Sequence, residues 1–80
     1  MRRHEGVIGI PEKDGDRSIC RYQAECSDRP SPFGIHKGRI SRVAIQIEGK
    51  EVCRYGRGWV TRPEGFAAEA AYQILLKEYN

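Results

Sequence analysis

The stretch RYGRGWVTRPEGFAAEAA, residues 54–71, decides the fold of this chain. It opens as a basic strand punctuated by two glycines and closes as an alanine-rich amphipathic segment. Between them, Thr61 and Glu64 have the spacing of a helix capping box, and Pro63 suits a first helical turn because no N–H is needed there. The junction therefore predicts a β-sheet followed by one C-terminal helix, over about residues 63–79.

The predicted helix has two distinct faces. At 100° per residue, its apolar face is made of Ala67, Ala70, Ala71, Ile74 and Leu75. The opposite stripe is polar and is made of Glu69, Gln73, Lys77 and Asn80. Because alanine side chains are small, we expect the helix to lie close to the sheet.

Period-2 alternation of apolar and polar residues predicts the strands that precede the helix. The expected strands are 7–10, which ends at a proline and so suits a sheet edge, 17–26, 39–48 and 51–57. We predict an α+β fold, an antiparallel meander of three to four strands with one C-terminal helix packed on one face. The whole chain, residues 1–80, is expected to be a single domain.

One register and one loop are left open by the pattern. A two-residue turn after Glu48 would put Val52 on the Ile45 face and Tyr55 on the Arg42 face, whereas a three-residue bulged turn would reverse this. The segment 27–38 contains two prolines and two glycines, so it is expected to be a rigid irregular loop that either covers an edge or has a function.

The cysteines and histidines do not have the spacing of a catalytic or metal site. Cys20 and Cys26 fall six residues apart on one predicted strand, roughly 20 Å apart, too far to share a zinc ion. With Cys53 they are expected to be free thiols in a core. We therefore predict no enzyme, no metal and no cofactor.

Composition indicates where such a chain would work. The formal net charge is +3, and no apolar run approaches the ~18 residues of a membrane span. The basic start is not followed by the apolar segment of a signal peptide. A cytoplasmic location and no membrane partner are therefore expected.

Arginine dominates the basic residues and suggests a possible partner. Residues 1–63 carry 13 Lys and Arg against 8 Asp and Glu. If a nucleic acid binds, the candidate residues are Arg21, Arg39, Arg42, Arg54, Tyr55, Arg57 and Trp59, because arginines contact phosphates and aromatic rings stack on bases. Such binding is expected to be weak and nonspecific, since the net charge is small.

The leading hypothesis is a non-enzymatic protein-interaction module. Its partner would be another protein or a second copy, as in a homodimer, bound through an exposed edge or through the open face of the sheet. The alternative is the weak nucleic-acid binder, using a basic sheet face. An open face that carried both arginines and aromatic rings would favour nucleic acid, and an apolar one would favour a protein.

From residue 21 onward the chain resembles a double-stranded-RNA-binding domain. The resemblance lies in the order strand, loop with Gly34-Ile-His36, strand, turn, strand and helix, and in the helix pattern Ala67-x-x-Ala70-Ala71. It implies a strand-then-helix topology. Glu64 stands where that family has phosphate-binding lysines, so the resemblance does not imply its mode of RNA binding.

The whole chain is also similar to a small uncharacterised bacterial family of about this length. The similarity lies in GVIGIP (6–11), in GIHKGRIS (34–41), in RGW (57–59) and in the final Tyr79-Asn80. Members occur in gut Firmicutes and in contexts resembling mobile elements. No function is established for that family, so the resemblance implies none.

Overall fold

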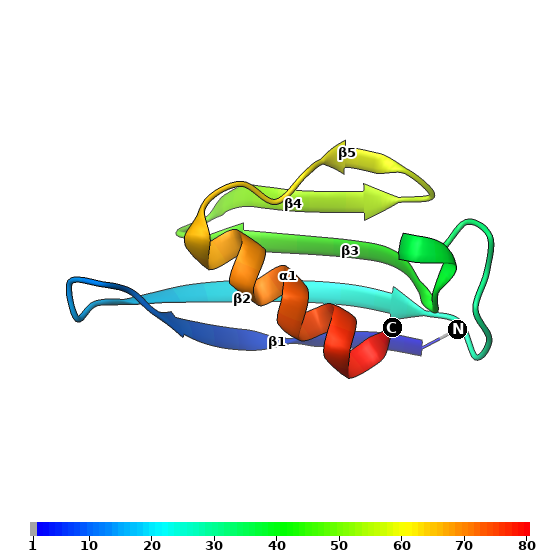
Figure 1. The fold of residues 1–80 in the computed structure, drawn as a ribbon, viewed down its shortest axis with the longest axis horizontal. Helices are drawn as coiled ribbons and strands as arrows, with labels where there is room; N and C mark the ends of the chain where they lie inside the picture. Colours follow the sequence, from blue (N-terminus) through cyan, green and yellow to red (C-terminus); the bar gives the residue numbers. More distant parts are fainter. Residues whose placement is uncertain (1) are drawn as a thin grey trace.

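The computed structural model describes residues 2–80 as a five-stranded sheet with one helix on it (Figure 1). The elements in chain order are β1 (Arg2–Pro11), β2 (Arg17–Cys26), the short 3-10 helix η1 (Ile35–Lys37), β3 (Ile40–Ile47), β4 (Lys50–Gly56), β5 (Trp59–Thr61) and α1 (Phe66–Tyr79). Each strand pairs antiparallel with the next, in the order β1-β2-β3-β4-β5. The predicted α+β meander with a C-terminal helix is confirmed, with five strands instead of three to four.

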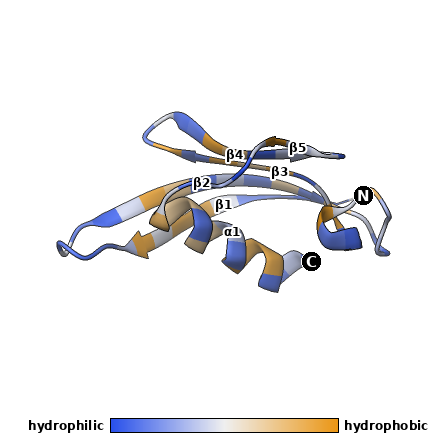
Figure 2. Cartoon of the chain, turned by 45° about the horizontal axis from the view of Figure 1, so that its top comes forward, coloured by the Kyte–Doolittle hydropathy of each residue, from blue (hydrophilic) through white to orange (hydrophobic). Residues whose placement is uncertain are grey.

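The core lies between α1 and the sheet face that it covers. Figure 2 shows α1 lying along one face of the sheet, with apolar residues recurring along both the strands and the helix. The largest fully buried side chains are Ile35, Ile40, Ile45, Leu75, Cys20 and Cys53. Ala71 is also fully buried, which lets the helix approach the sheet as predicted.

The strand predictions differ from the structure mainly at the two edges. β2 has the predicted bounds, whereas β1 runs over residues 2–11 and not only over 7–10. The prediction missed β5, because a three-residue strand is too short for alternation to show. β5 also reverses the chain, so that α1 starts at the opposite end of the sheet from loop 27–38 (Figure 1). The resemblance to a double-stranded-RNA-binding domain is therefore not supported.

The hairpin between β3 and β4 settles the register that the pattern left open. Ile47 pairs with Lys50 across a two-residue turn, in which Glu48 and Gly49 have φ values of 52° and 78°. A register shift next to Ile45 then leaves Val52 as the extra residue of a bulge. Because of this bulge, Tyr55 lies on the covered face of the sheet beside Val43, although the turn has only two residues.

The predicted start of the helix is wrong. Thr61 is the last residue of β5, and α1 begins at Phe66 after Gly65, whose φ of 90° favours glycine. No side chain caps the N-terminus of α1, so Thr61 and Glu64 do not form the expected capping box. The capping pattern is a local signal, and pairing with β4 outweighs it at Thr61.

The buried face of the helix is rotated from the predicted one. The buried positions are Ala67, Ala68, Ala71, Tyr72 and Leu75. Ile74, predicted to be buried, is 44% exposed. Tyr72 is buried in its place, and its ring packs against Trp59 of β5 in a T-shaped contact at 5.4 Å.

Candidate interaction surfaces

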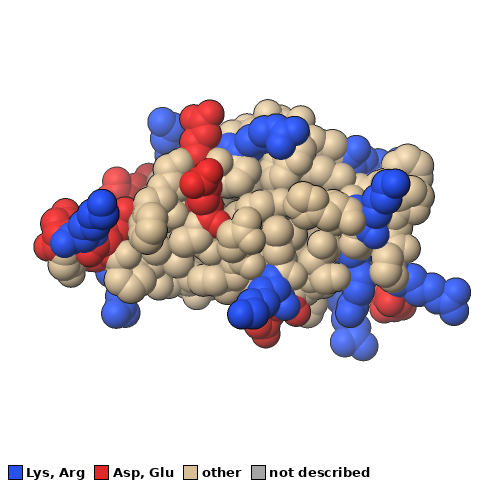
Figure 3. Space-filling view, viewed as in Figure 1, with Lys and Arg blue, Asp and Glu red and all other residues tan. Residues whose placement is uncertain are grey.

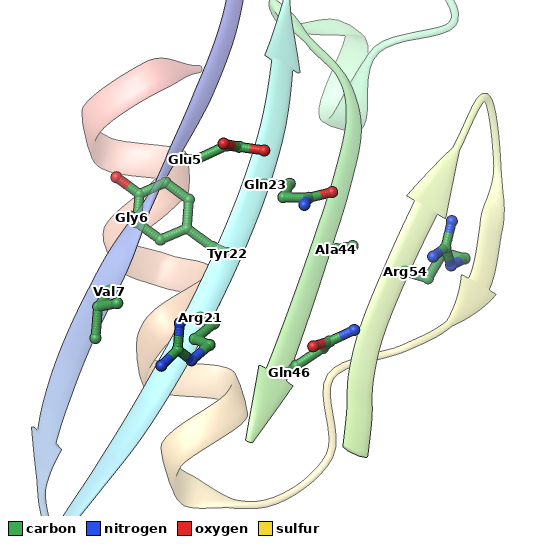
Figure 4. Close-up of a pocket in the computed structure, with 9 residues that line it drawn as sticks. All are labelled: Glu5, Gly6, Val7, Arg21, Tyr22, Gln23, Ala44, Gln46 and Arg54. Atoms are coloured by element: carbon green, nitrogen blue, oxygen red, sulfur yellow. The ribbon is translucent and has the colours of Figure 1, made fainter. Parts of the chain in front are cut away.

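The open face of the sheet is a shallow polar surface with a small-residue centre. A hollow of about 370 Å³ lies over β1 to β4, and Figure 4 shows its side chains projecting from all four strands with the helix behind the sheet. Its floor is low because Ala44, near the centre, carries only a methyl group. Arg21 and Gln46 flank this floor as extended polar side chains.

Most of the arginines on this open face form ion pairs with neighbouring carboxylates. Arg3 lies 3.1 Å from Glu5, and Arg42 lies 3.7 Å from Glu25. Arg54 contacts the Glu51 carboxylate at 2.6 Å, and its hydrogen bond holds the pKa of Glu51 below its usual value. The face therefore carries both signs of charge and is neither strongly basic nor apolar.

The predicted aromatic residues lie on the other side of the sheet. Tyr55 is buried on the covered face, and its hydroxyl donates a hydrogen bond of 2.8 Å to the Phe33 carbonyl oxygen. Trp59 lies half-buried between Tyr55 and Tyr72, at ring distances of 5.1 and 5.4 Å. The structure thus brings Arg21, Arg42 and Arg54 to the open face and separates them from the aromatic rings.

The two remaining predicted residues, Arg39 and Arg57, lie at one end of the sheet. Arg39 donates a hydrogen bond from Nε to the Ser27 carbonyl oxygen, at 3.2 Å. The guanidinium of Arg57 lies over the ring of Phe33, 5.7 Å from its centroid. Phe33 is 60% exposed and was not singled out from the sequence, where a single aromatic residue in a loop carries no pattern.

The loop 27–38 beside them is held in place by the end of the chain. The Asn80 side chain accepts a hydrogen bond of 3.0 Å from the Ile40 N–H and donates one of 3.1 Å to the Ile35 carbonyl oxygen. Gly38 makes room for it, since a Cβ there would lie 2.3 Å from the Asn80 amide oxygen. The loop is therefore tied to the helix by specific hydrogen bonds, and Asn80 is a structural residue that the helical stripe had placed on the polar face.

Charge is divided between the two ends of the long axis, which measures 39 Å. The end with the β1–β2 and β3–β4 turns and the start of α1 carries Glu12, Asp14, Asp16, Glu48, Glu51, Glu64 and Glu69 against Lys13, Arg17, Lys50, Arg62 and the guanidinium of Arg54. The other end carries Arg2, Arg3, Arg29, Lys37, Arg39, Arg42, Arg57 and Lys77 against Glu5, Glu25, Asp28 and Glu78. Figure 3 shows red side chains mostly toward the first end and blue side chains prevailing at the second. We call these the acidic end and the basic end.

The edge strand β1 is long and regular, and its middle lacks the usual protection of a sheet edge. Its ladder with β2 runs from Arg2 to Pro11 without a register shift, whereas each of the other three ladders has one. Residues 6–10 contain no charged side chain, and proline occurs only at the end. Natural sheets protect their edges with charges, prolines, bulges or short strands. The opposite edge, β5, is protected in this way because it has only three residues.

The helix holds β1 firmly in this position. His4 stacks on Tyr79 at 4.3 Å, and the hydroxyl groups of Tyr22 and Tyr79 are 3.0 Å apart. Their hydrogen bond is the main cause that raises the pKa of Tyr79 to about 12. Gly6 allows the Tyr22 ring to lie against β1, because a Cβ would fall 2.8 Å from its hydroxyl oxygen. The edge is therefore presented as a preformed strand.

The thiols lie inside the core. Cys20, Cys26 and Cys53 are free and buried, and burial raises the pKa of each. For Cys53 the pKa rises to about 11, with Glu51 adding to the effect of burial. Among residues 2–80, no three His, Cys, Asp or Glu side chains are placed to hold a metal ion. Within the same residues, no helix is long and apolar enough to cross a membrane.

Together these features define a small two-layer α+β domain with one covered and one open sheet face. Residues 2–80 match the family model described as Domain of unknown function (DUF7678), and the chain belongs to that family. This agrees with its resemblance to an uncharacterised small family. No curated protein and no solved structure matches the chain.

Proposed function

We propose that this domain is a non-enzymatic interaction module that pairs with a second copy of itself through the edge of β1. The observation that carries the proposal is the ten-residue β1 edge, which is unbulged and uncharged over residues 6–10. Such an edge offers a row of backbone N–H and C=O groups to another strand, and strand addition is a common mode of protein recognition.

The division of charge favours an antiparallel arrangement of the two copies. If β1 pairs with its own copy about Val7, so that the two Val7 residues lie opposite each other, Arg3 of one copy lies opposite Pro11 of the other. The acidic turn that follows Pro11 then lies beside the Arg2 and Arg3 of the other copy. The acidic end of each copy would thus meet the basic end of its partner.

The side chains near the middle of β1 fit this arrangement. Val7 is 55% exposed on the open face, and Ile8 is only partly buried on the covered face. Pairing would add a neighbour to both faces and bury more of each side chain. A contact made by one strand is small, so we expect a dimer that forms reversibly with concentration.

A catalytic role has little support from the side chains. The three thiols are the strongest nucleophiles in the chain, and their raised pKa values keep them protonated at neutral pH. They also suit the reducing cytoplasm, where we place the protein. The alternative, a nucleic-acid site on the sheet face, requires arginines and aromatic rings on one surface. The candidate arginines and rings lie on opposite faces of the sheet, so only the arginines still support it.

The test is sedimentation velocity over a concentration series, comparing the wild type with Val7→Lys. A lysine on the edge strand should shift the wild-type dimer toward monomer, because an edge lysine opposes strand pairing. Ile19→Lys is the matched control: Ile19 is 47% exposed on the same face but lies on β2. A wild type that stays monomeric at every concentration, or equal effects of the two substitutions, would refute self-pairing through β1.

A further inference from the structure

The basic end carries a surface that the β1 edge does not use. It consists of Phe33 in loop 27–38, Arg57 over its ring, and three further cationic residues in or next to the same loop, Arg29, Lys37 and Arg39. We propose that this surface, called here the Phe33 platform, binds single-stranded nucleic acid. This inference does not depend on self-pairing, because the β4–β5 turn, which carries Arg57 over Phe33, lies at the opposite edge of the sheet from β1 (Figure 1).

The ring and the guanidinium form a ready stacking surface. Arg57 lies over Phe33 at 5.7 Å, while 60% of the Phe33 residue remains exposed. An exposed aromatic side chain next to an arginine plane can stack an unpaired base and contact the neighbouring phosphate. In a duplex the bases are already stacked on each other, so no base face is free to stack on the Phe33 ring. A single strand is therefore the form that this surface fits.

Two of these cationic residues have an unfavourable backbone conformation. Lys37 and Arg57 have φ values of 58° and 64°, in the left-handed region, which costs roughly 1–2 kcal/mol for a residue other than glycine. Glycine would satisfy both backbone positions without that cost. Two of the four cations of this surface are thus kept at backbone positions where glycine would be less strained.

The loop is held in one conformation before any ligand binds. Tyr55 donates its hydrogen bond to the Phe33 carbonyl oxygen, and His36 Nε2 lies 3.3 Å from the Tyr72 hydroxyl oxygen. Asn80 holds the neighbouring Ile35 and Ile40. Because the loop is already ordered, little conformational entropy remains to be lost on binding.

The charge count sets the size of the expected salt effect. Each phosphate contact on a single strand contributes a slope of ~0.7 to the fall of log affinity with log salt. Four contacts give a slope of about 2.8, so the affinity should fall about 50-fold between ~50 and ~200 mM salt. Losing two of the four cations should reduce the slope to about 1.4 and weaken binding at the lower salt by at least tenfold.

The experiment is fluorescence anisotropy with a labelled single-stranded oligonucleotide and a duplex of the same length, at these two salt concentrations. The test variant is Lys37→Gln with Arg57→Gln, and the matched control is Lys13→Gln with Arg17→Gln at the acidic end, which removes the same charge. Phe33→Ala should lower the affinity for the single strand and leave that for the duplex unchanged. Melting temperatures of all variants should stay near that of the wild type, because these side chains are exposed.

Three results would overturn the inference. One is the absence of binding to the single strand at the lower salt. Another is an equal loss in the test and control variants, which would mean that net charge and not this surface matters. The third is a larger loss in Arg21→Gln with Arg54→Gln than in the test variant, which would move the site to the open face of the sheet.

Discussion

Removing the Asn80 side chain should destabilise the domain, although Asn80 is one polar residue at the end of a helix. Asn80→Ala deletes the hydrogen bonds to the Ile40 N–H and to the Ile35 carbonyl oxygen, and both of these residues are buried. Each lost bond is worth roughly 0.5–1.5 kcal/mol, so the free energy of unfolding should fall by about 2 kcal/mol. For a domain of this size, the melting temperature should fall by roughly 8–16 °C.

A double-mutant cycle tests the same contact more sharply. Gly38→Ala should be strongly destabilising in the wild type, because the new Cβ would lie 2.3–2.5 Å from the Asn80 amide group. In the Asn80→Ala background that space is open, and the φ of Gly38, −98°, is accessible to alanine. The cost should therefore shrink by about 1 kcal/mol or more. Equal costs in both backgrounds, or an Asn80→Ala protein that melts like the exposed-site control Glu78→Ala, would refute this reasoning.

Three further predictions concern the core. Ala71→Asp should cost roughly 3 kcal/mol or more, because Ala71 is fully buried against the sheet and a carboxylate there has no partner; calorimetry should show no such loss for the exposed control Gln73→Asp. Thiol titration should find three free thiols in denaturant and a much slower reaction in the native protein. Because folding raises the Cys53 pKa from its ordinary 9.0 to about 11, the unfolded state releases its proton first, so stability should be complete below pH 9 and fall toward pH 11. Cys53→Ala should flatten this decline, and an identical pH profile in the two proteins would contradict it.

Alternation along the chain predicted the interior of the sheet well. β2 has the predicted bounds because its side chains alternate between a covered and a solvated face over its whole length. Residues 2–6 of β1 were missed because Arg2, Arg3 and Glu5 give no apolar alternation. The capping pattern at Thr61 misled the prediction of the helix start, because a short strand uses that residue.

The candidate surfaces depend on contacts between distant residues, which local patterns do not reveal. Asn80 binds residues 40 and 45 positions earlier, and no spacing along the chain indicates such a contact. The separation of Tyr55 from the sheet arginines follows from one bulge at Val52, which shifts the register of β4. Likewise, net charge summed along the sequence does not show the acidic and basic ends, because each end collects residues from several separate segments.

Amide hydrogen exchange, measured residue by residue by NMR at increasing protein concentration, tests the central claim most directly. Self-pairing through β1 predicts that the outward-facing amides of β1, those of Arg3, Glu5, Val7 and Gly9, become slower to exchange as the concentration rises. The amides of the opposite edge, β5, should not change. Exchange in β1 that does not depend on concentration, or protection that grows at β5 instead, would contradict the proposal that this edge is the interaction surface.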